Sequence, residues 1–277
     1  MNSGVLNQAP ARLCVPGVGA NYLCGDRPGL RTQTSAAQAP ELLDLLLRRG
    51  QVRVLFQPIF DISNHSVLGY EALTRGPLGS LLESSDDLFN CAESLGRLIE
   101  LECLAIRTAL NDFVELNLSG LLFLNVTRDA LVEGSISKLL ASLGSNSARI
   151  VLELCETRSG DELTLLAEVL AAQRARGIGL ALDDFGVRYS CLRRWMQLLP
   201  NFVKVDQQFV LGIHSDPLKQ AMLRAVVDIA AVAGCRVIAE GVEVQQDLKT
   251  LQQIGVGYAQ GYLLGRPSRC PQLMTEI

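Results

Sequence analysis

Short apolar segments alternate with longer segments of helical periodicity from about residue 41 onward. Short runs of apolar residues are typical of buried strands, whereas apolar residues three and four apart are typical of amphipathic helices. The predicted strands are Val52–Ile62, Val67–Thr74, Leu121–Val126, Arg149–Leu154, the run that starts at Gly177, Phe202–Val205, Arg236–Ala239 and Tyr258–Leu264. The predicted helices are Glu41–Arg49, Asp86–Leu95, Leu98–Phe113, Ile136–Leu143, Asp161–Arg176, a short helix around Trp195, Pro217–Ala233 and Gln245–Ile254.

Strands that alternate with helices predict an α/β fold with a parallel sheet. About eight strands in roughly 235 residues match the size of a closed (β/α)8 barrel. The turn Ser63-Asn64-His65 predicts a hairpin between the first two strands, so we expect the first strand to run antiparallel to its neighbour. An open, doubly wound sheet is the alternative. It would predict a glycine-rich phosphate loop after an early strand, and the sequence has none.

The composition narrows the function classes. The chain has 29 acidic and 25 basic residues, a net charge of −4, which argues against binding a nucleic-acid polymer through bulk charge. No apolar run is long enough to span a bilayer, and the first ten residues lack a secretion signal. The eight cysteines include no Cys-x-x-Cys pair, so we expect reduced thiols and a cytoplasmic protein. Residues 1–40 are predicted to be a poorly ordered leader or linker, and residues 41–277 the folded domain.

Polar residues stand at the C-terminal ends of the predicted strands, where an apolar core does not explain them. They are Glu71, Asn125, Glu153 with Glu156 just beyond it, Asp183 and Asp184, Lys204 and Asp206, Glu240, and Gln260. For any single carboxylate a solvated strand end is the simpler explanation, but the recurrence on seven strands makes it a poor one. In a barrel these strand ends open on one face, where active sites are built.

Oxygen ligands without His or Cys select hard cations, namely Mg2+, Mn2+ or Ca2+. The adjacent Asp183 and Asp184 could hold two ions close together, an arrangement that polarises a phosphoryl group and generates hydroxide. His65 in the predicted turn and His214 are expected on the surface, away from this face.

Several motifs in order resemble the EAL-domain family of cyclic di-GMP phosphodiesterases over about residues 45–275. They are Gln57-Pro58-Ile59, Glu71-Ala72-Leu73 with Arg75, Leu124-Asn125-Val126-Thr127, Glu153-Leu154-Cys155-Glu156, Asp183-Asp184-Phe185-Gly186, Lys204-Val205-Asp206, Ala239-Glu240-Gly241-Val242-Glu243, and Gln260-Gly261-Tyr262 with Pro267. The resemblance implies a modified TIM (β/α)8 barrel with an antiparallel first strand. It also implies hydrolysis of cyclic di-GMP to linear 5′-pGpG, and a homodimer.

The resemblance further implies two Mg2+ or Mn2+ ions, with Ca2+ as a candidate inhibitor. The first ion would be held by Glu71, Asn125, Glu153 and Asp183, and the second by Asp183, Asp184 and Glu240. Glu240 would also be the general base, and Lys204 would hold the attacking water and the phosphate. Gln57, Arg75 and Gln260 would contact or support the substrate, and Glu156, Asp206 and Glu243 would support loops.

Two positions depart from the family pattern. Val187-Arg188 follows Gly186 where the family has x-Gly, which removes a glycine and adds a cation beside the expected metals. Cys155 replaces the usual Thr and is small enough to be tolerated. An alternative function is an inactive module that binds cyclic di-GMP and signals through a partner; the presence of all the expected metal ligands favours the enzyme. A third possibility is a sensor enzyme in which residues 1–40 belong to a regulatory linker.

Overall fold

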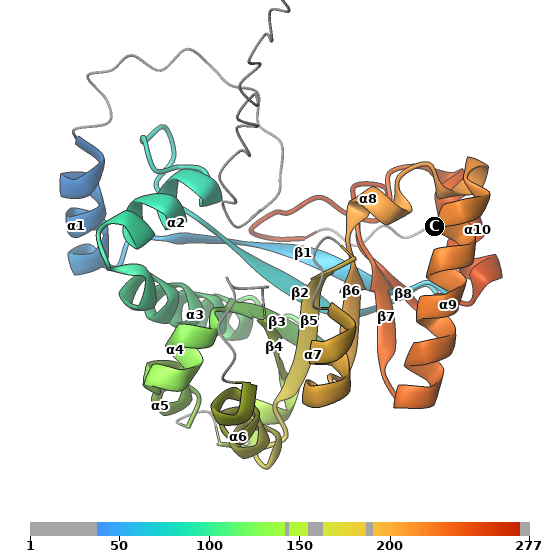
Figure 1. Cartoon of the computed structure of the whole chain (residues 1–277). Helices are drawn as coiled ribbons and strands as arrows, with labels where there is room; N and C mark the ends of the chain where they lie inside the picture. Colours follow the sequence, from blue (N-terminus) through green and yellow to red (C-terminus); the bar gives the residue numbers. More distant parts are fainter. Residues whose placement is uncertain (1–37, 142–143, 155–162, 187–190, 272–277) are drawn as a thin grey trace, which may run out of the picture.

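Eight strands close into a barrel in the computed structural model, which describes residues 38–141, 144–154, 163–186 and 191–271. Strand β1 (Arg53–Asp61) pairs antiparallel with both β2 (Ser66–Arg75) and β8 (Tyr258–Ala259). The remaining neighbours, from β2 to β8 in chain order, pair in parallel. The predicted α/β barrel with an antiparallel first strand is therefore confirmed (Figure 1).

The β1–β2 hairpin turns where the sequence predicts. His65 adopts a left-handed backbone with φ of 59°, and the Asp61 carboxylate accepts a 3.0 Å hydrogen bond from the Ser63 backbone N–H. The pairing sets Gln57 opposite Glu71. The hairpin thus brings two of the predicted site residues side by side.

The other predicted strands form with small shifts at their ends, except the last. They are β3 (Leu121–Val126), β4 (Ile150–Leu154), β5 (Gly179–Phe185), β6 (Phe202–Val205) and β7 (Arg236–Ala239). The prediction that the last strand continues to Leu264 is wrong, because β8 ends at Ala259. At Gly261 the backbone passes so close to Val242 that a Cβ would lie 2.2 Å from its backbone N and O atoms, and the chain turns there.

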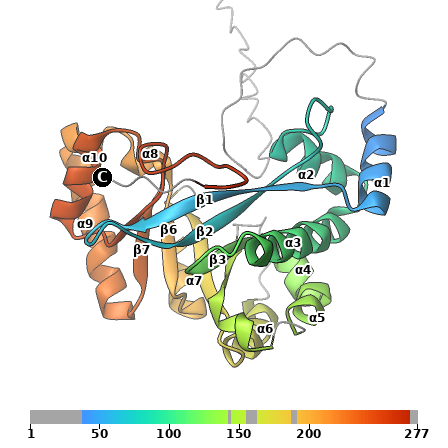
Figure 2. The ribbon, with the colours of Figure 1, turned by 180° about the vertical axis from the view of Figure 1, so that it is seen from behind.

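Helices cover the outside of the barrel. Those predicted from the sequence are α1 (Ala39–Arg49), α2 (Ser85–Ser94), α3 (Leu98–Glu115), α5 (Ser135–Ala141), α6 (Leu163–Arg174), α7 (Cys191–Leu198), α9 (Pro217–Ala233) and α10 (Gln245–Ile254). In both ribbon views α1 and α2 lie toward one end of the long β1–β2 hairpin, and α9 and α10 lie on the opposite side (Figures 1 and 2). No helix within the described ranges combines the length and apolarity needed to cross a bilayer.

Within the described ranges, four short elements were not expected from the sequence. They are α4 (Arg128–Glu133), α8 (Gln207–Val210) and the 3-10 turns η2 (Gly144–Arg149) and η3 (Ile213–Ser215). The Thr127 and Asp206 side chains cap α4 and α8, accepting hydrogen bonds from the backbone N–H groups of Ala130 and Gln208. Such pieces are too short to show a helical period, so only their caps could have indicated them.

The core is divided between the outside and the inside of the barrel. The larger apolar cluster fills the space between strands and helices. A second, inner cluster is formed by Ile59, Phe123, Val151, Ala181, Phe202 and Ile238. The Phe123 and Phe202 rings meet edge to face with their centroids 5.3 Å apart. The polar site lies directly next to this inner cluster.

Nearly all of the predicted leader lies outside the described residues.

Candidate active site

The site residues stand two positions beyond the inner apolar cluster on successive strands. Alternate residues of a strand point to the same side, so a polar residue two positions after an inward-facing one also faces inward. This relation links Phe123 to Asn125, Val151 to Glu153, Ala181 to Asp183, Phe202 to Lys204, and Ile238 to Glu240. On the antiparallel β1 the order is reversed, and Gln57 precedes Ile59 by two.

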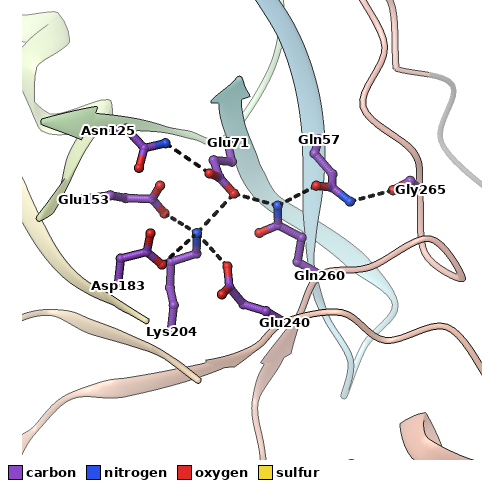
Figure 3. Close-up of polar contacts among 9 residues, drawn as sticks. All are labelled: Gln57, Glu71, Asn125, Glu153, Asp183, Lys204, Glu240, Gln260 and Gly265. Atoms are coloured by element: carbon purple, nitrogen blue, oxygen red, sulfur yellow. Dashed lines mark hydrogen bonds and ion pairs between the residues drawn. The ribbon is translucent and has the colours of Figure 1, made fainter. Parts of the chain in front are cut away.

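The ammonium of Lys204 lies at the centre of the site (Figure 3). Its Nζ is 2.8 Å from Glu240 Oε1, 3.0 Å from Glu153 Oε1, 3.1 Å from Glu71 Oε2 and 3.4 Å from Asp183 Oδ1. Lys204 and Glu153 are 1% and 0% exposed. One buried cation therefore faces four carboxylates, three on strands β2, β4 and β5 and one at the residue that follows β7.

Glu71 is held by amides as well. Its Oε1 accepts a 3.1 Å hydrogen bond from Asn125 Nδ2, and its Oε2 accepts a 2.7 Å bond from Gln260 Nε2. Gln260 Nε2 also donates to Gln57 Oε1 at 2.9 Å, and Gln57 Nε2 donates to the Gly265 carbonyl at 3.1 Å. The chain of amides connects the carboxylate cluster to the loop that follows β8 (Figure 3).

Asp183 and Asp184 are consecutive, yet both can face the site. Asp184 has a left-handed backbone with φ of 55°, and the pairing of β5 with β6 is irregular between Leu182 and Phe185. A non-glycine residue in this region is uncommon and clusters at functional sites. As a result Asp183, Asp184 and Glu240 each offer an oxygen within 4.8 Å of the other two.

Burial and mutual repulsion control the pKa values in the site. Burial raises the pKa of Glu153 well above its usual value, and the Glu71 charge adds to the effect. Burial likewise raises the pKa of Glu240 to about 8. Burial also raises the pKa of Asp183, which Lys204 partly opposes.

In Glu71 and Lys204 the surroundings favour the charged form instead. Burial would raise the pKa of Glu71, but Lys204 and the hydrogen bonds from Gln260 and Asn125 hold it below the usual value. The surrounding carboxylates raise the pKa of Lys204 well above its usual value, although burial opposes this. Four carboxylates therefore share one ammonium, and without metal their repulsion favours protonation of Glu153, Asp183 and Glu240.

The residues fit a hard divalent cation. Glu153 Oε2 and Gln260 Oε1 are buried and have no hydrogen-bond partner among the described residues. Buried polar atoms in native proteins are normally satisfied, so such atoms indicate a place for a ligand, ion or water. The donors are carboxylate and amide oxygens, which suit Mg2+ or Mn2+.

The remaining predicted site residues lie around this cluster or outside the description. Arg75 donates from Nη1 to the Thr74 carbonyl at 2.9 Å. Burial raises the pKa of nearby Asp86, and the charge of Arg75 partly opposes this. Asp206 is buried as the cap of α8, and Glu243 is exposed. Glu156 lies outside the described residues.

The two histidines lie outside the cluster, in line with the sequence. His65 is exposed in the hairpin turn, and the His214 Nδ1 lies 2.6 Å from Asp247 Oδ1 on α10. The sequence did not reveal the link from Gln57 through Gln260 to Glu71. It also did not single out Glu102, a buried carboxylate on the apolar face of α3, although its place in that stripe was a readable signal.

Comparisons with a family model and with curated proteins point to the same family. The family model for the EAL domain matches residues 40–267. The cyclic di-GMP phosphodiesterase NbdA of Pseudomonas aeruginosa is 30% identical over 245 residues, which are 84% of this chain and 31% of that protein. The bifunctional diguanylate cyclase/cyclic di-GMP phosphodiesterase MucR of the same organism is 28% identical over 87% of this chain and 37% of its own length. The chain thus spans about a third of the length of these curated relatives.

Solved structures share the fold. Klebsiella pneumoniae BlrP1 in complex with manganese and cyclic di-GMP superposes with a TM-score of 0.71 and 29% identity, covering 78% of this chain and 56% of that one. BlrP1 was also solved with calcium and cyclic di-GMP, and superposes with a TM-score of 0.70. An EAL-domain protein of Listeria monocytogenes, at 23% identity, matches with a TM-score of 0.76 over 86% of this chain and 96% of its own, which supports the fold. By its sequence and its barrel, the chain belongs to the EAL-domain family.

Proposed function

We propose that the chain is a divalent-metal-dependent phosphodiesterase that hydrolyses cyclic di-GMP to linear 5′-pGpG. The observation that carries the proposal is the convergence of four carboxylates on one ammonium at the strand ends, with a buried Glu153 oxygen that lacks a hydrogen-bond partner among the described residues. The relatives named as cyclic di-GMP phosphodiesterases, and the BlrP1 complexes, support the choice of substrate.

Two Mg2+ or Mn2+ ions would polarise the scissile phosphoryl group and lower the pKa of the attacking water. Glu71, Asn125, Glu153 and Asp183 would hold one ion, and Asp183, Asp184 and Glu240 the other. The closeness of the oxygens of Asp183, Asp184 and Glu240 supports the second set. Ca2+ would compete for the same oxygens while tolerating a looser geometry, which makes it a candidate inhibitor.

Glu240 is the proposed general base. Its carboxylate lies beside the ammonium of Lys204 and the oxygens of Asp183 and Asp184, so it is within reach of a water held among them. Water would add to phosphorus as the bond to the 3′ oxygen breaks. The water proton would go to Glu240, and the released 3′ oxygen would take a proton from solvent water, leaving the phosphate on the 5′ oxygen. Lys204, 2.8 Å from Glu240, would hold the water and the phosphate.

Gln57, Gln260 and Arg75 are proposed to hold the substrate. The first two are tied to Glu71 by hydrogen bonds, which would keep substrate contacts in register with the reacting centre. The Arg75 guanidinium, four residues beyond Glu71, suits a phosphate. Asp206, through its cap on α8, together with Glu156 and Glu243, would support the surrounding loops.

The test is incubation of the purified chain with cyclic di-GMP and Mg2+ or Mn2+, following pGpG by chromatography. Turnover should appear with metal, disappear with chelator, and return when metal is restored. Undiminished turnover in chelator, with metal absent by elemental analysis, would rule out the two-metal mechanism. Binding of cyclic di-GMP without cleavage under all metal conditions would instead support the alternative binding module.

A homodimer is part of the same proposal. Leu218, Met222, Ile229 and Val232 are 69%, 45%, 43% and 93% exposed on α9, and with Ala225 they follow one another at alternating spacings of four and three residues. This spacing forms an apolar seam on one helix face, which suits a second copy of the chain. Sedimentation of the parent and of Val232→Glu would test it.

A cytoplasmic location stays a prediction, supported by the free thiols of Cys91, Cys103, Cys235 and Cys270.

A further inference from the structure

A buried carboxylate outside the cluster around Lys204 holds the end of β3. Glu102 is 2% exposed on the otherwise apolar face of α3. Its Oε1 accepts a 3.1 Å hydrogen bond from the Thr127 backbone N–H, and its Oε2 accepts a 2.9 Å bond from the Thr127 hydroxyl. Burial raises the pKa of Glu102 to about 7, which the Thr127 hydrogen bonds oppose. A carboxylate is thus kept where an apolar residue would pack at lower cost.

Thr127 connects Glu102 to the start of α4. The Thr127 hydroxyl donates to Glu102 and accepts from the Ala130 backbone N–H at 3.3 Å, so its position is fixed from both sides. Asn125, two residues earlier, donates to Glu71 in the site. The carboxylate of Glu102 is therefore connected through two peptide units to a proposed metal ligand.

The strand pairing between β2 and β3 ends one residue before Asn125. The pairing of β2 with β3 stops at Ala72 opposite Leu124, whereas β4 continues alongside Asn125 and Val126. A small cavity lies where the two strands separate, lined in part by Thr74, Glu102 and Asn125. The two hydrogen bonds from Thr127 to Glu102 therefore add a constraint on this end of β3, beside its pairing with β4 and the hydrogen bond from Asn125 to Glu71.

We propose that Glu102 is a positioning residue that, through both hydrogen bonds to Thr127, sets Asn125 at the geometry that the metal site requires. The inference rests on the proposed function, since it gives Asn125 the role of a metal ligand. Groups that hydrogen-bond a metal ligand directly typically change metal affinity 10–100-fold when they are removed. Glu102 acts one step further away, through Thr127, so we expect an effect at the lower end of that range.

The experiment measures binding of Mn2+ alone by electron paramagnetic resonance, and then hydrolysis of cyclic di-GMP. Glu102→Ala and Thr127→Val should each weaken Mn2+ binding by about tenfold and lower kcat. Glu102→Gln should retain most of the affinity, because its amide can accept from the Thr127 N–H and donate to the Thr127 oxygen. Thr127→Ser should match the parent, because it keeps the hydroxyl.

Asp247→Ala is the matched control. Asp247 is also a buried carboxylate that accepts backbone N–H hydrogen bonds, from Gly212 and His214, none of which belongs to the site. Its removal should lower stability and leave Mn2+ binding unchanged. An equal loss of affinity in this control would overturn the inference, because the effect would then be a general loss of stability.

The other outcomes also decide the question. Parental Mn2+ affinity and kcat in Glu102→Ala would overturn the positioning role, and so would a Glu102→Gln variant as weak as Glu102→Ala, since charge alone would then matter. If Glu102→Ala fails to fold, equal affinities in Thr127→Val and Thr127→Ser would overturn it. A parent protein that binds no Mn2+ and cleaves no substrate would refute the proposed function itself, whereas a parent that binds Mn2+ with unaffected variants would refute this inference alone.

Discussion

The carboxylates of Glu153, in the cluster around Lys204, and of Asp247 are similarly hidden from solvent but are held in opposite ways. Asp247, 1% exposed, accepts hydrogen bonds from the backbone N–H groups of Gly212 and His214 and contacts the His214 ring. Burial would raise its pKa, but these donors hold it below the usual value. Glu153, by contrast, shares one ammonium with three other carboxylates, and its pKa is raised well above the usual value.

The difference separates a structural charge from a functional one. A buried carboxylate whose acceptor positions are filled by backbone donors stabilises the fold. A buried carboxylate left among like charges costs stability, and such an arrangement persists where it serves binding or chemistry. The free energy of unfolding should therefore change in opposite directions in the two regions when a carboxylate is neutralised or removed, or when the pH changes.

The largest effect is expected at Glu71, which contacts Lys204, Asn125 and Gln260 together. Glu71→Ala should lower kcat by at least about 100-fold, because even partners beyond the ligands cost 10–100-fold. Binding of cyclic di-GMP should suffer less if Gln57 and Arg75 hold the substrate. Glu115→Ala, at the exposed end of α3, is the control and should leave the rate unchanged. Parental turnover by Glu71→Ala would show that the site has been misplaced.

Neutralising Glu153 should separate stability from function. Glu153→Gln removes a buried charge that Glu71 and Asp183 repel, so the chelated variant should be about 1 kcal/mol more stable than the chelated parent. The same variant should bind Mn2+ at least about tenfold more weakly. Thermal unfolding in chelator and metal titration measure the two quantities. A variant that loses stability and keeps its metal affinity would place Glu153 with Asp247 as a structural charge.

Asp247→Ala should behave in the reverse way. It leaves the backbone donors of Gly212 and His214 without this acceptor, at a cost of about 2 kcal/mol in the free energy of unfolding. The kcat should not change. The folded-state pKa lies below the ordinary 3.8, so this stabilisation is present above pH 3.8 and is lost as the pH falls through the folded value. Acid unfolding of the variant should lack the pH-dependent stabilisation that Asp247 provides. A kcat that falls together with stability would contradict the assignment of Asp247 as a structural charge.

The carboxylates around Lys204 should give the free energy of unfolding the opposite pH dependence. The pKa of Glu240 rises from 4.5 to about 8 on folding, so between these values the folded state binds more protons than the unfolded one. The free energy of unfolding of the chelated protein should therefore fall as the pH rises from 4.5 to 8. Glu240→Gln should flatten that slope, as measured by denaturant titration at several pH values. A slope that persists unchanged in the variant would exclude Glu240 as its source.

Strand periodicity explains how much of this could be predicted from the sequence. Inward-facing positions repeat every two residues, so Phe123 predicts Asn125 and Phe202 predicts Lys204 once a barrel is assumed. The end of β8 was mispredicted because the strand ends at Ala259, and the backbone then passes close to Val242 at Gly261, a contact that no local pattern indicates. The amide chain from Gln57 to the Gly265 carbonyl joins residues more than 200 positions apart, which no local pattern can indicate.

The smallest effect is expected at Arg188, where the sequence departs from the family's glycine and which lies outside the described residues. A further cation beside two divalent ions should oppose metal binding by about 1 kcal/mol if partly solvated, which is several-fold in affinity. Arg188→Gly should lower the Mg2+ concentration for half-maximal activity or raise kcat. Arg188→Ala removes the charge without the backbone freedom of glycine, and so separates the two contributions. If charge dominates, Ala and Gly should act alike and the difference from the parent should shrink at high salt, because mobile ions screen it. If Arg188 instead points outward and pairs with a carboxylate such as Glu156, both variants will keep the parental Mg2+ dependence and kcat, and the departure will prove neutral.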